Sequence, residues 1–251
     1  MARLLILLLA MALPAKAEEV VAGLSQNRVA ITANFDGSEI LIFGAVKRDE
    51  PPPGTGPLQV IITVAGPSQP VMVRRKDKRF GIWINADAVE VDAAPSFYAV
   101  ATSGPLNEIL KNIDDLRYKI SIPRAIRSVG APMTIKNSRA FTEALIRIRI
   151  EKGLYQLDMN TVEVAQETLF NTSIALPSNL TEGAYTARIF LTRSGNVVAV
   201  HSAEIDVQKV GLERWLFNLA HELPLAYGIL TLVIAISAGW GASAVFRYIR
   251  S

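Results

Sequence analysis

The sequence contains no cysteine, and this absence excludes several kinds of chemistry. None of its 251 residues can supply a thiol nucleophile, an iron–sulfur ligand, a cysteine ligand to zinc or a cysteine for lipid attachment. No disulfide can form either, so in an oxidising compartment the fold would depend on its apolar core alone.

Familiar catalytic motifs are absent as well. The chain has no Gly-x-Ser-x-Gly, no His-Glu-x-x-His and no glycine-rich phosphate loop. Of its two histidines, His201 lies in a predicted strand and His221 is followed by Glu222. An imidazole beside a carboxylate can bind a metal or relay protons. Adjacent residues point to different faces of a helix, however, which favours a simple polar pair. We therefore predict a protein that is not an enzyme and uses no metal and no cofactor.

The longest apolar runs lie near the two ends. Near the N-terminus, Arg3 precedes ten apolar residues, 4–13, which are too few to span a bilayer. The small-x-small sequence at 15–17 is typical of a cleavage site. We predict a secretory signal peptide over residues 1–17; the alternative is an N-terminal membrane anchor.

Residues 223–246 carry no charge. As a helix they would rise about 35 Å, which exceeds the bilayer's hydrocarbon core of about 30 Å. Tyr227 and Trp240 lie near the two ends, where interfacial aromatic residues are common. We predict a transmembrane helix over 223–246, with the lipid bilayer as its partner, and a juxtamembrane amphipathic segment over 209–222.

Basic residues after this helix set the expected orientation. Residues 247–251 include Arg247 and Arg250 and no acid, which is typical of the cytoplasmic side. With the signal peptide, this predicts a single-pass protein of the bacterial inner membrane, with a periplasmic N-terminal region and a cytoplasmic tail. The net charge of +3 arises in the end segments. The exported part is close to neutral, so we expect no nucleic-acid partner.

Between the ends, short β-rich runs alternate with turn sequences, as in β-sandwiches. The predicted strands cover residues 28–34, 39–46, 58–65, 70–74, 79–85, 97–103, 161–165, 168–175, 183–192 and 196–207. We predict a mainly β fold with two immunoglobulin-like β-sandwich-type domains, residues 18–122 and 123–208, a short helix or two and one C-terminal transmembrane helix. Trp83 is expected in the core of the first domain. Tyr185, after a glycine, resembles the buried tyrosine of a late immunoglobulin strand.

The segment 138–152 fits two structures. Phe141, Leu145 and Ile148 share a helical face, whereas Ile146 and Ile150 alternate with arginines in the manner of a strand. The helix is favoured, because Ser138 can cap it and Gly153 can end it.

A strongly basic cluster lies in the sequence VRRKDKRFGIWIN at residues 73–85. Its five basic residues are Arg74, Arg75, Lys76, Lys78 and Arg79. Such groups can bind a small oxyanion or anionic lipid headgroups. The simpler interpretation is a solvated β-hairpin whose charges protect a strand edge. Strand alternation would place Arg75 and Arg79 on the face opposite the other three, which favours the hairpin.

Small residues gather in the second half of the predicted span. They form two small-xxx-small pairs, Ser237 with Gly241 and Gly239 with Ser243. Such pairs allow close packing of a second transmembrane helix, from a partner or from another copy of the chain.

Several landmarks occur together in this sequence. They include RVAIT-x-x-FDGSEILIFGAV after residue 27, the VRRKDKRFGIWIN element, LPSNLTEGAYTARIFL from residue 176, and FNLAHELPLAYG running into a span that ends GWGASAVFR. In these the chain resembles the "putative transmembrane protein" family of α-proteobacteria. The resemblance implies an exported region and one C-terminal span. It also implies an association with transporters of the sulfite/sulfonate exporter type.

We therefore expect a membrane-anchored accessory or interaction subunit of an envelope or transport system, with a membrane-protein partner. The alternative is a sensor or binding module that captures a small oxyanion through residues 74–79.

Overall fold

The computed structural model describes residues 19–32, 35–47, 56–129 and 137–250. The predicted signal peptide lies outside this range. The described chain forms two compact units. The first holds residues 19–29 and 36–207, and the second holds residues 30–32, 35 and 208–250.

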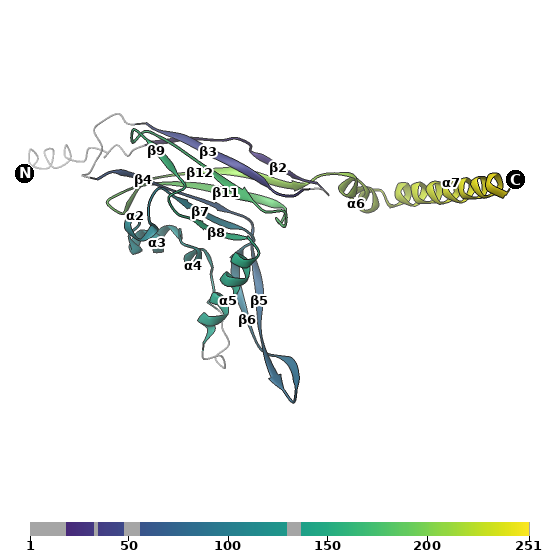
Figure 1. The fold of residues 1–251 in the computed structure, drawn as a ribbon, viewed down its shortest axis with the longest axis horizontal. Coiled ribbons are helices and arrows are strands. Elements are labelled where there is room, and N and C mark those ends of the chain that lie inside the picture. The colour runs from purple at the N-terminus through teal and green to yellow at the C-terminus, as the bar shows by residue number, and fades with distance from the viewer. Residues whose placement is uncertain (1–18, 33–34, 48–55, 130–136, 251) are drawn as a thin grey trace, which may run out of the picture. The chain divides into compact units, whose positions relative to one another are not determined.

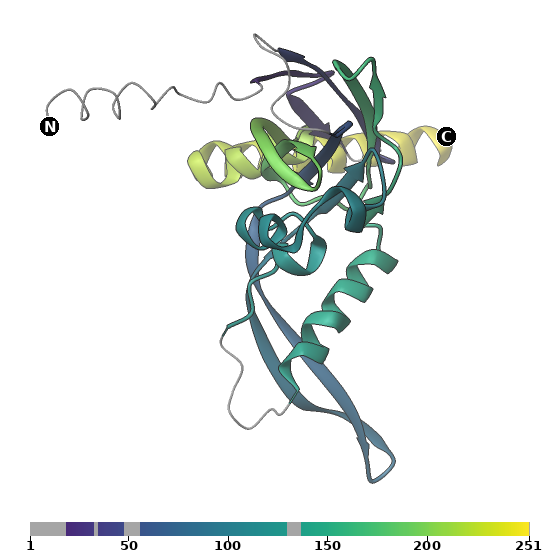
Figure 2. The ribbon, with the colours of Figure 1, turned by 90° about the vertical axis from the view of Figure 1, so that its left-hand side faces the viewer.

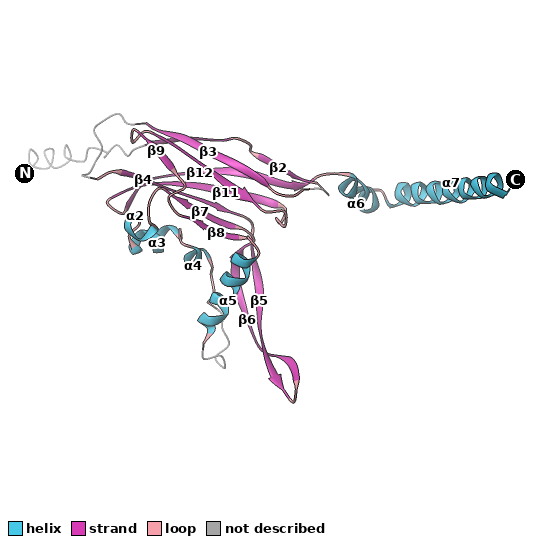
Figure 3. Cartoon of the chain, in the orientation of Figure 1, coloured by secondary structure: helices cyan, strands magenta, loops and turns pink. Residues whose placement is uncertain are grey.

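Two sheets of mainly antiparallel strands make up most of the first unit (Figures 1 and 3). One sheet has four strands in the order β1-β3-β10-β9. Its strands are β1 (Glu19–Leu24), β3 (Ser38–Lys47), β9 (Glu163–Ala165) and β10 (Leu169–Leu176). The register pairs Ile42 of β3 with Thr172 of β10. Both residues are buried, so alternate positions of this sheet face the interior.

The other large sheet has six strands in the order β2-β12-β11-β4-β7-β8. Its strands are β2 (Arg28–Ile31), β4 (Leu58–Ala65), β7 (Tyr98–Thr102), β8 (Tyr155–Asp158), β11 (Gly183–Arg193) and β12 (Asn196–Lys209). Strand β8 runs parallel to β7, and the other described pairs in this sheet are antiparallel.

These orders correspond to a single immunoglobulin-like sandwich. The order β1-β3-β10-β9 matches strands A-B-E-D of that fold, and β12-β11-β4 matches G-F-C, with β7 in the place of C′. Strands from both expected domains share each sheet, because β3 pairs with β10 and β4 pairs with β11. The mainly β fold is confirmed, but the structure has one sandwich where the sequence suggested two.

Long insertions interrupt this sandwich, and they explain the difference. Between β4 and β7 the chain forms a two-stranded hairpin of β5 (Ser68–Arg79) and β6 (Ile82–Pro95). Between β7 and β8 the residues that the structure describes form four helices. They are α2 (Leu106–Ile109), α3 (Asn112–Tyr118), α4 (Ile122–Ala125) and α5 (Ser138–Glu151). The helix favoured over 138–152 is thus present, with Asn137 rather than Ser138 as its N-cap.

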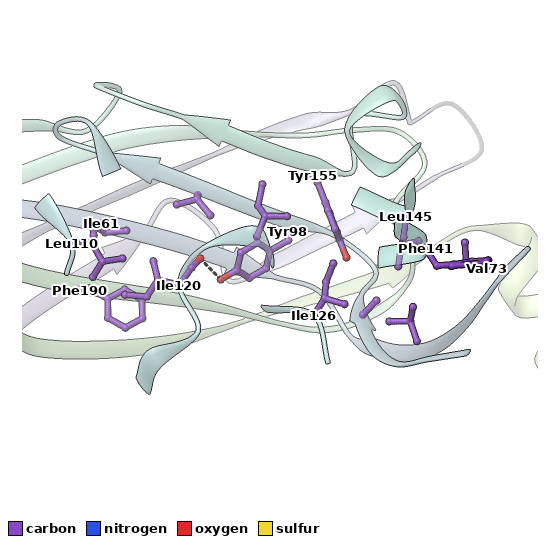
Figure 4. Packing of buried hydrophobic residues seen from close by; sticks show 14 of the residues in the cluster. Ile61, Val73, Tyr98, Leu110, Ile120, Ile126, Phe141, Leu145, Tyr155 and Phe190 are labelled. Carbon is purple, nitrogen blue, oxygen red and sulfur yellow. Dashed lines mark hydrogen bonds between the residues drawn. The ribbon is translucent and has the colours of Figure 1, made fainter. Parts of the chain in front are cut away.

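The insertions cover one face of the six-stranded sheet (Figures 1 and 4). A single apolar cluster joins Ile61, Tyr98 and Phe190 of the sheet to Ile120, Phe141 and other residues of the insertions. Alternate residues of β4, such as Val60 and Ile62, are also fully buried, although they do not belong to this cluster. Strand β4 is therefore apolar on both faces, which explains its nearly continuous LQVIITVA sequence.

The second unit is mainly helical. It contains α6 (Leu212–Glu222) and α7 (Pro224–Arg250). Helix α6 corresponds to the predicted juxtamembrane segment and α7 to the predicted span and tail. Within α7, residues Pro224–Ser243 are long and apolar enough to cross a membrane, and none of the window that qualifies is buried.

Candidate functional site: the β5–β6 hairpin

The β5–β6 hairpin ends in a two-residue turn. Arg79 and Ile82 form the last strand pair, and Phe80 and Gly81 between them have φ of 50° and 85°. Positive φ at both central residues indicates a type I′ turn, whose twist suits a β-hairpin. Asn-Gly is the usual sequence of such a turn, so a phenylalanine at its first position is unusual.

The base of the hairpin packs on helix α5. Val73, Val89 and Val91 are buried in the same cluster as Phe141 and Leu145 of the helix. In the strand register Val73 lies opposite Val89, so these side chains project from one face of the ribbon. The two elements lie side by side in Figure 2, and the ribbon continues past the helix.

A β-bulge separates the base from the tip. Lys76 lies opposite Asn85, but Arg75 lies opposite Asp87, so Ala86 is an extra residue on β6. The Arg75 guanidinium forms an ion pair with the Asp87 carboxylate. It also lies 5.8 Å from the centroid of the Phe141 ring. Arg75 therefore connects β5, β6 and α5 and belongs to the support of the hairpin.

The basic cluster divides between the two faces of the ribbon. Arg74, Lys76 and Lys78 alternate along β5 and share one face. Trp83 lies directly opposite Lys78 and projects from that face too. Arg79 lies on the other face, with its Nε 3.5 Å from the Asp77 carboxylate. The five residues are not gathered around one point, and the oxyanion site over residues 74–79 stays a prediction.

The tip of the hairpin exposes apolar side chains. Every residue from 74 to 85 is exposed. Phe80 is fully exposed, and Ile82 and Trp83 have exposed fractions of 65% and 67%. Trp83 was expected in the core, and this expectation is wrong. The ribbon extends beyond α5 at this point, and among the described residues no layer covers either face (Figure 2).

The hollows described in the first unit lie elsewhere. The larger, of about 580 Å³, is lined by residues of the α3–α5 region, among them Asp115, Ser121, Arg124 and Arg139. The Asp115 carboxylate accepts hydrogen bonds from the backbone N–H groups of Ile120 and Ser121. Arg139 pairs with Glu143 at 2.9 Å. These polar groups therefore serve local structure, and none of the basic hairpin residues lines this hollow.

Two buried tyrosines fix the insertions to the sheet. The Tyr98 hydroxyl donates a 2.8 Å hydrogen bond to the backbone carbonyl of Ile120 (Figure 4). The Tyr155 hydroxyl donates one of 2.9 Å to the carbonyl of Pro95 and accepts one of 3.3 Å from Arg149. Burial raises the pKa of Tyr155 to about 12, although Arg149 opposes this shift. Both hydroxyls are engaged by structural partners and are poor candidates for acid–base chemistry.

The histidines also occupy structural positions. His201 lies in β12 opposite Ile189. The His221 ring stacks on Phe217 within α6, with centroids 4.1 Å apart, and its Nδ1 lies 2.9 Å from the Phe217 carbonyl oxygen. Among the described residues there is no group of three or more His, Cys, Asp or Glu side chains that could hold a metal ion.

Helix α7 presents the predicted small residues. The Ser237 hydroxyl donates a 2.7 Å hydrogen bond to the carbonyl of Val233 in the same helix, so it needs no partner from outside. A Cβ atom added at Gly239 or Gly241 would meet nothing within 4 Å. Two residues along a helix correspond to a rotation of about 200°. The Ser237–Gly241 and Gly239–Ser243 pairs therefore lie on nearly opposite sides of α7.

One family model matches almost the whole described chain. No protein of curated function matches the sequence significantly. The model of a family described as "putative transmembrane protein (Alph_Pro_TM)" matches residues 19–248, which include the sandwich, its insertions and most of α7. The chain therefore belongs to this family of transmembrane proteins.

Proposed function

We propose that this protein is a non-enzymatic accessory subunit of an envelope or transport system. In this proposal α7 anchors the chain in the bacterial inner membrane, the sandwich lies in the periplasm, and the residues after α7 lie in the cytoplasm. The observation that carries the proposal is the apolar window of α7, within which no residue is buried. A helix of this kind needs an apolar environment that the described chain does not supply.

An apolar patch on the sandwich supports a partner that is a protein. Val21, Leu41, Phe43 and Leu169 are each between 43% and 57% exposed. The register places Val21 and Leu169 on either side of Ala45 on the outer face of the four-stranded sheet, with Phe43 in the next row. Contiguous exposed apolar side chains of this kind are typical of protein–protein contacts.

The orientation is supported by the sequence at both ends. Arg247 and Arg250 follow the apolar window, and basic residues are enriched on the cytoplasmic side of spans. Residues 1–17 have the pattern of an export signal. The non-enzymatic role is supported by the lack of any familiar nucleophile motif.

Purification of the tagged full chain from membranes in a mild detergent tests this proposal. We expect a membrane protein to copurify in a fixed molar ratio. The double variant Leu41→Ser/Phe43→Ser should lose it, whereas Ile113→Ser/Leu116→Ser, which removes similarly exposed side chains from α3, should retain it. Repeated recovery of the chain alone, as a monomer or as a homo-oligomer through α7, would overturn the accessory role.

The oxyanion module remains the second candidate, because Arg74, Lys76 and Lys78 share one face of β5. Calorimetric titration of the full chain with sulfite, sulfate and phosphate tests it. Binding that is lost in the Arg74→Ala/Lys76→Ala variant, which changes two residues of this face, is expected if the module exists. The absence of heat, or binding indifferent to these changes, removes this candidate.

A further inference from the structure

We propose that the tip of the β5–β6 hairpin binds an anionic phospholipid bilayer, with Phe80 and Trp83 in the interfacial layer, Lys78 at the lipid phosphates and Lys76 and Arg74 just outside them. This proposal goes beyond the accessory function and does not depend on a protein partner.

The turn residue Phe80 gives the first argument. A non-glycine residue with positive φ is unfavourable, and a bulky one more so than asparagine. No burial of the ring offsets this unfavourable backbone conformation, because the Phe80 side chain is fully exposed. Neither local geometry nor packing within the described chain explains an aromatic residue at this position. An unfavourable, exposed aromatic side chain at a protruding tip indicates contact with something outside the chain.

The order of side chains along the ribbon gives the second argument. A strand rises about 3.3 Å per residue, so Lys78, Lys76 and Arg74 lie about 7, 13 and 20 Å from Phe80 along β5. A bilayer's interfacial region is about 5–7 Å thick on each side, and apolar groups of surface-bound proteins enter it by about 5–10 Å. Insertion of the tip would therefore bring Lys78 to the phosphates and leave Lys76 and Arg74 just outside them.

The distribution of charge gives the third argument. On the face that carries Trp83, residues Arg74, Lys76 and Lys78 are accompanied by Asn85 and Ala88, and the first acid on this face is Glu90, opposite Met72 and further from the tip. The acids of the tip region, Asp77 and Asp87, lie on the opposite face, where they pair with Arg79 and Arg75. One face is thus cationic and aromatic, a combination that suits anionic headgroups and the interfacial layer.

Trp83 can report this contact in the full chain. In a Trp215→Phe/Trp240→Phe background it is the single tryptophan. The protein is placed in nanodiscs of phosphatidylcholine alone or with phosphatidylglycerol, and the neutral discs are also mixed with anionic vesicles. The anionic nanodiscs test contact with the bilayer that carries the chain. The neutral discs mixed with anionic vesicles test contact with a second bilayer. We expect a blue shift of Trp83 emission, and quenching by brominated acyl chains, wherever an anionic bilayer is within reach.

Two sets of variants separate binding from folding. Each basic residue near an anionic surface contributes about fivefold in affinity, so Arg74→Gln/Lys76→Gln/Lys78→Gln should weaken vesicle binding by about 100-fold. The matched control Arg124→Gln/Arg147→Gln/Lys152→Gln removes the same charge from exposed sites outside the hairpin. This control should change the affinity for vesicles little. Phe80→Asn supplies a favoured turn residue, so it should preserve the hairpin and still reduce quenching.

An unchanged Trp83 spectrum in every lipid arm would overturn the proposal. So would equal effects of the two triple variants. Loss of a copurifying protein from the Phe80→Asn variant, with no lipid effect, would instead assign the tip to a protein partner. The accessory function would survive that result, because its own test depends on Leu41 and Phe43.

Discussion

The hydroxyl of Tyr185, at the start of β11, donates a 2.7 Å hydrogen bond to the backbone carbonyl of Thr181, four residues earlier. The Tyr185 ring is buried, with its centroid 6.2 Å from that of Phe97. A tyrosine that bonds back to the chain just before a late strand is the tyrosine corner of immunoglobulin-like sandwiches. Here it joins the strand equivalent to F to the loop that precedes it.

The variant Tyr185→Phe tests this corner. It keeps the ring but leaves the Thr181 carbonyl without this donor, which should cost about 1 kcal/mol of the free energy of unfolding. For a domain of this size that corresponds to a melting temperature lower by about 2–4 °C. Thermal unfolding of the full chain in detergent measures it. Tyr227→Phe, outside the sandwich, should leave the melting temperature unchanged, and equal effects of the two variants would argue against the corner.

Stability should fall at alkaline pH because of Tyr155. Burial raises its pKa to about 12, against 10 in the unfolded chain. Between these values the unfolded chain loses the Tyr155 proton and the folded chain keeps it, so stability is complete below pH 10 and falls as the pH rises towards 12. Two pKa units correspond to about 2.7 kcal/mol.

Melting temperatures of the wild-type chain and of Tyr155→Phe, measured from pH 8 to pH 11.5, check this dependence. The variant should be less stable at pH 8 but should lose less stability on going to high pH. Parallel curves for the two proteins would show that Tyr155 is not responsible. Tyr98 and Tyr185, whose pKa values are also raised by burial, should provide the dependence that remains in the variant.

Two adjacent arginines of β5 should differ in their effect on stability. Arg75 pairs with Asp87 and lies against the Phe141 ring, whereas Arg74 is exposed on the opposite face. We expect Arg75→Ala to lower the free energy of unfolding by about 1 kcal/mol and Arg74→Ala to change it by less than about 0.5 kcal/mol. A double-mutant cycle with Asp87→Ala isolates the ion pair. A coupling energy of zero in that cycle would remove the Arg75–Asp87 ion pair from the support of the hairpin.

Local patterns were sufficient to predict much of the fold. Strand β4 was predicted with its observed ends, because LQVIITVA is bounded by turn residues. Helix α5 was recognisable from the spacing of Phe141 and Leu145, both of which are buried. Two short strands, β1 and β8, were missed. Strand β8 depends on parallel pairing with β7, which is more than fifty residues away, and no local pattern encodes such a contact.

The division into two domains failed for a similar reason. The pairing of β3 with β10 joins segments more than 120 residues apart, and no local pattern indicates it. The hairpin and the helices between these strands were therefore interpreted as the boundary between two domains. In the hairpin, alternation correctly separated Arg74 from Arg75. The partner of Arg75 was not predictable, because the bulge at Ala86 brings Asp87 rather than Ala86 opposite it. The exposure of Trp83 likewise depends on where α5 ends relative to the ribbon.

The central claim is that α7 holds this protein in a membrane. Alkaline carbonate extraction of membranes that contain the full chain tests it most directly, with a variant that ends at Lys209 as the control. We predict that the full chain stays in the membrane pellet and that the shortened chain, which retains every strand of both sheets, is recovered in the soluble fraction. Release of the intact full chain by carbonate would contradict the account.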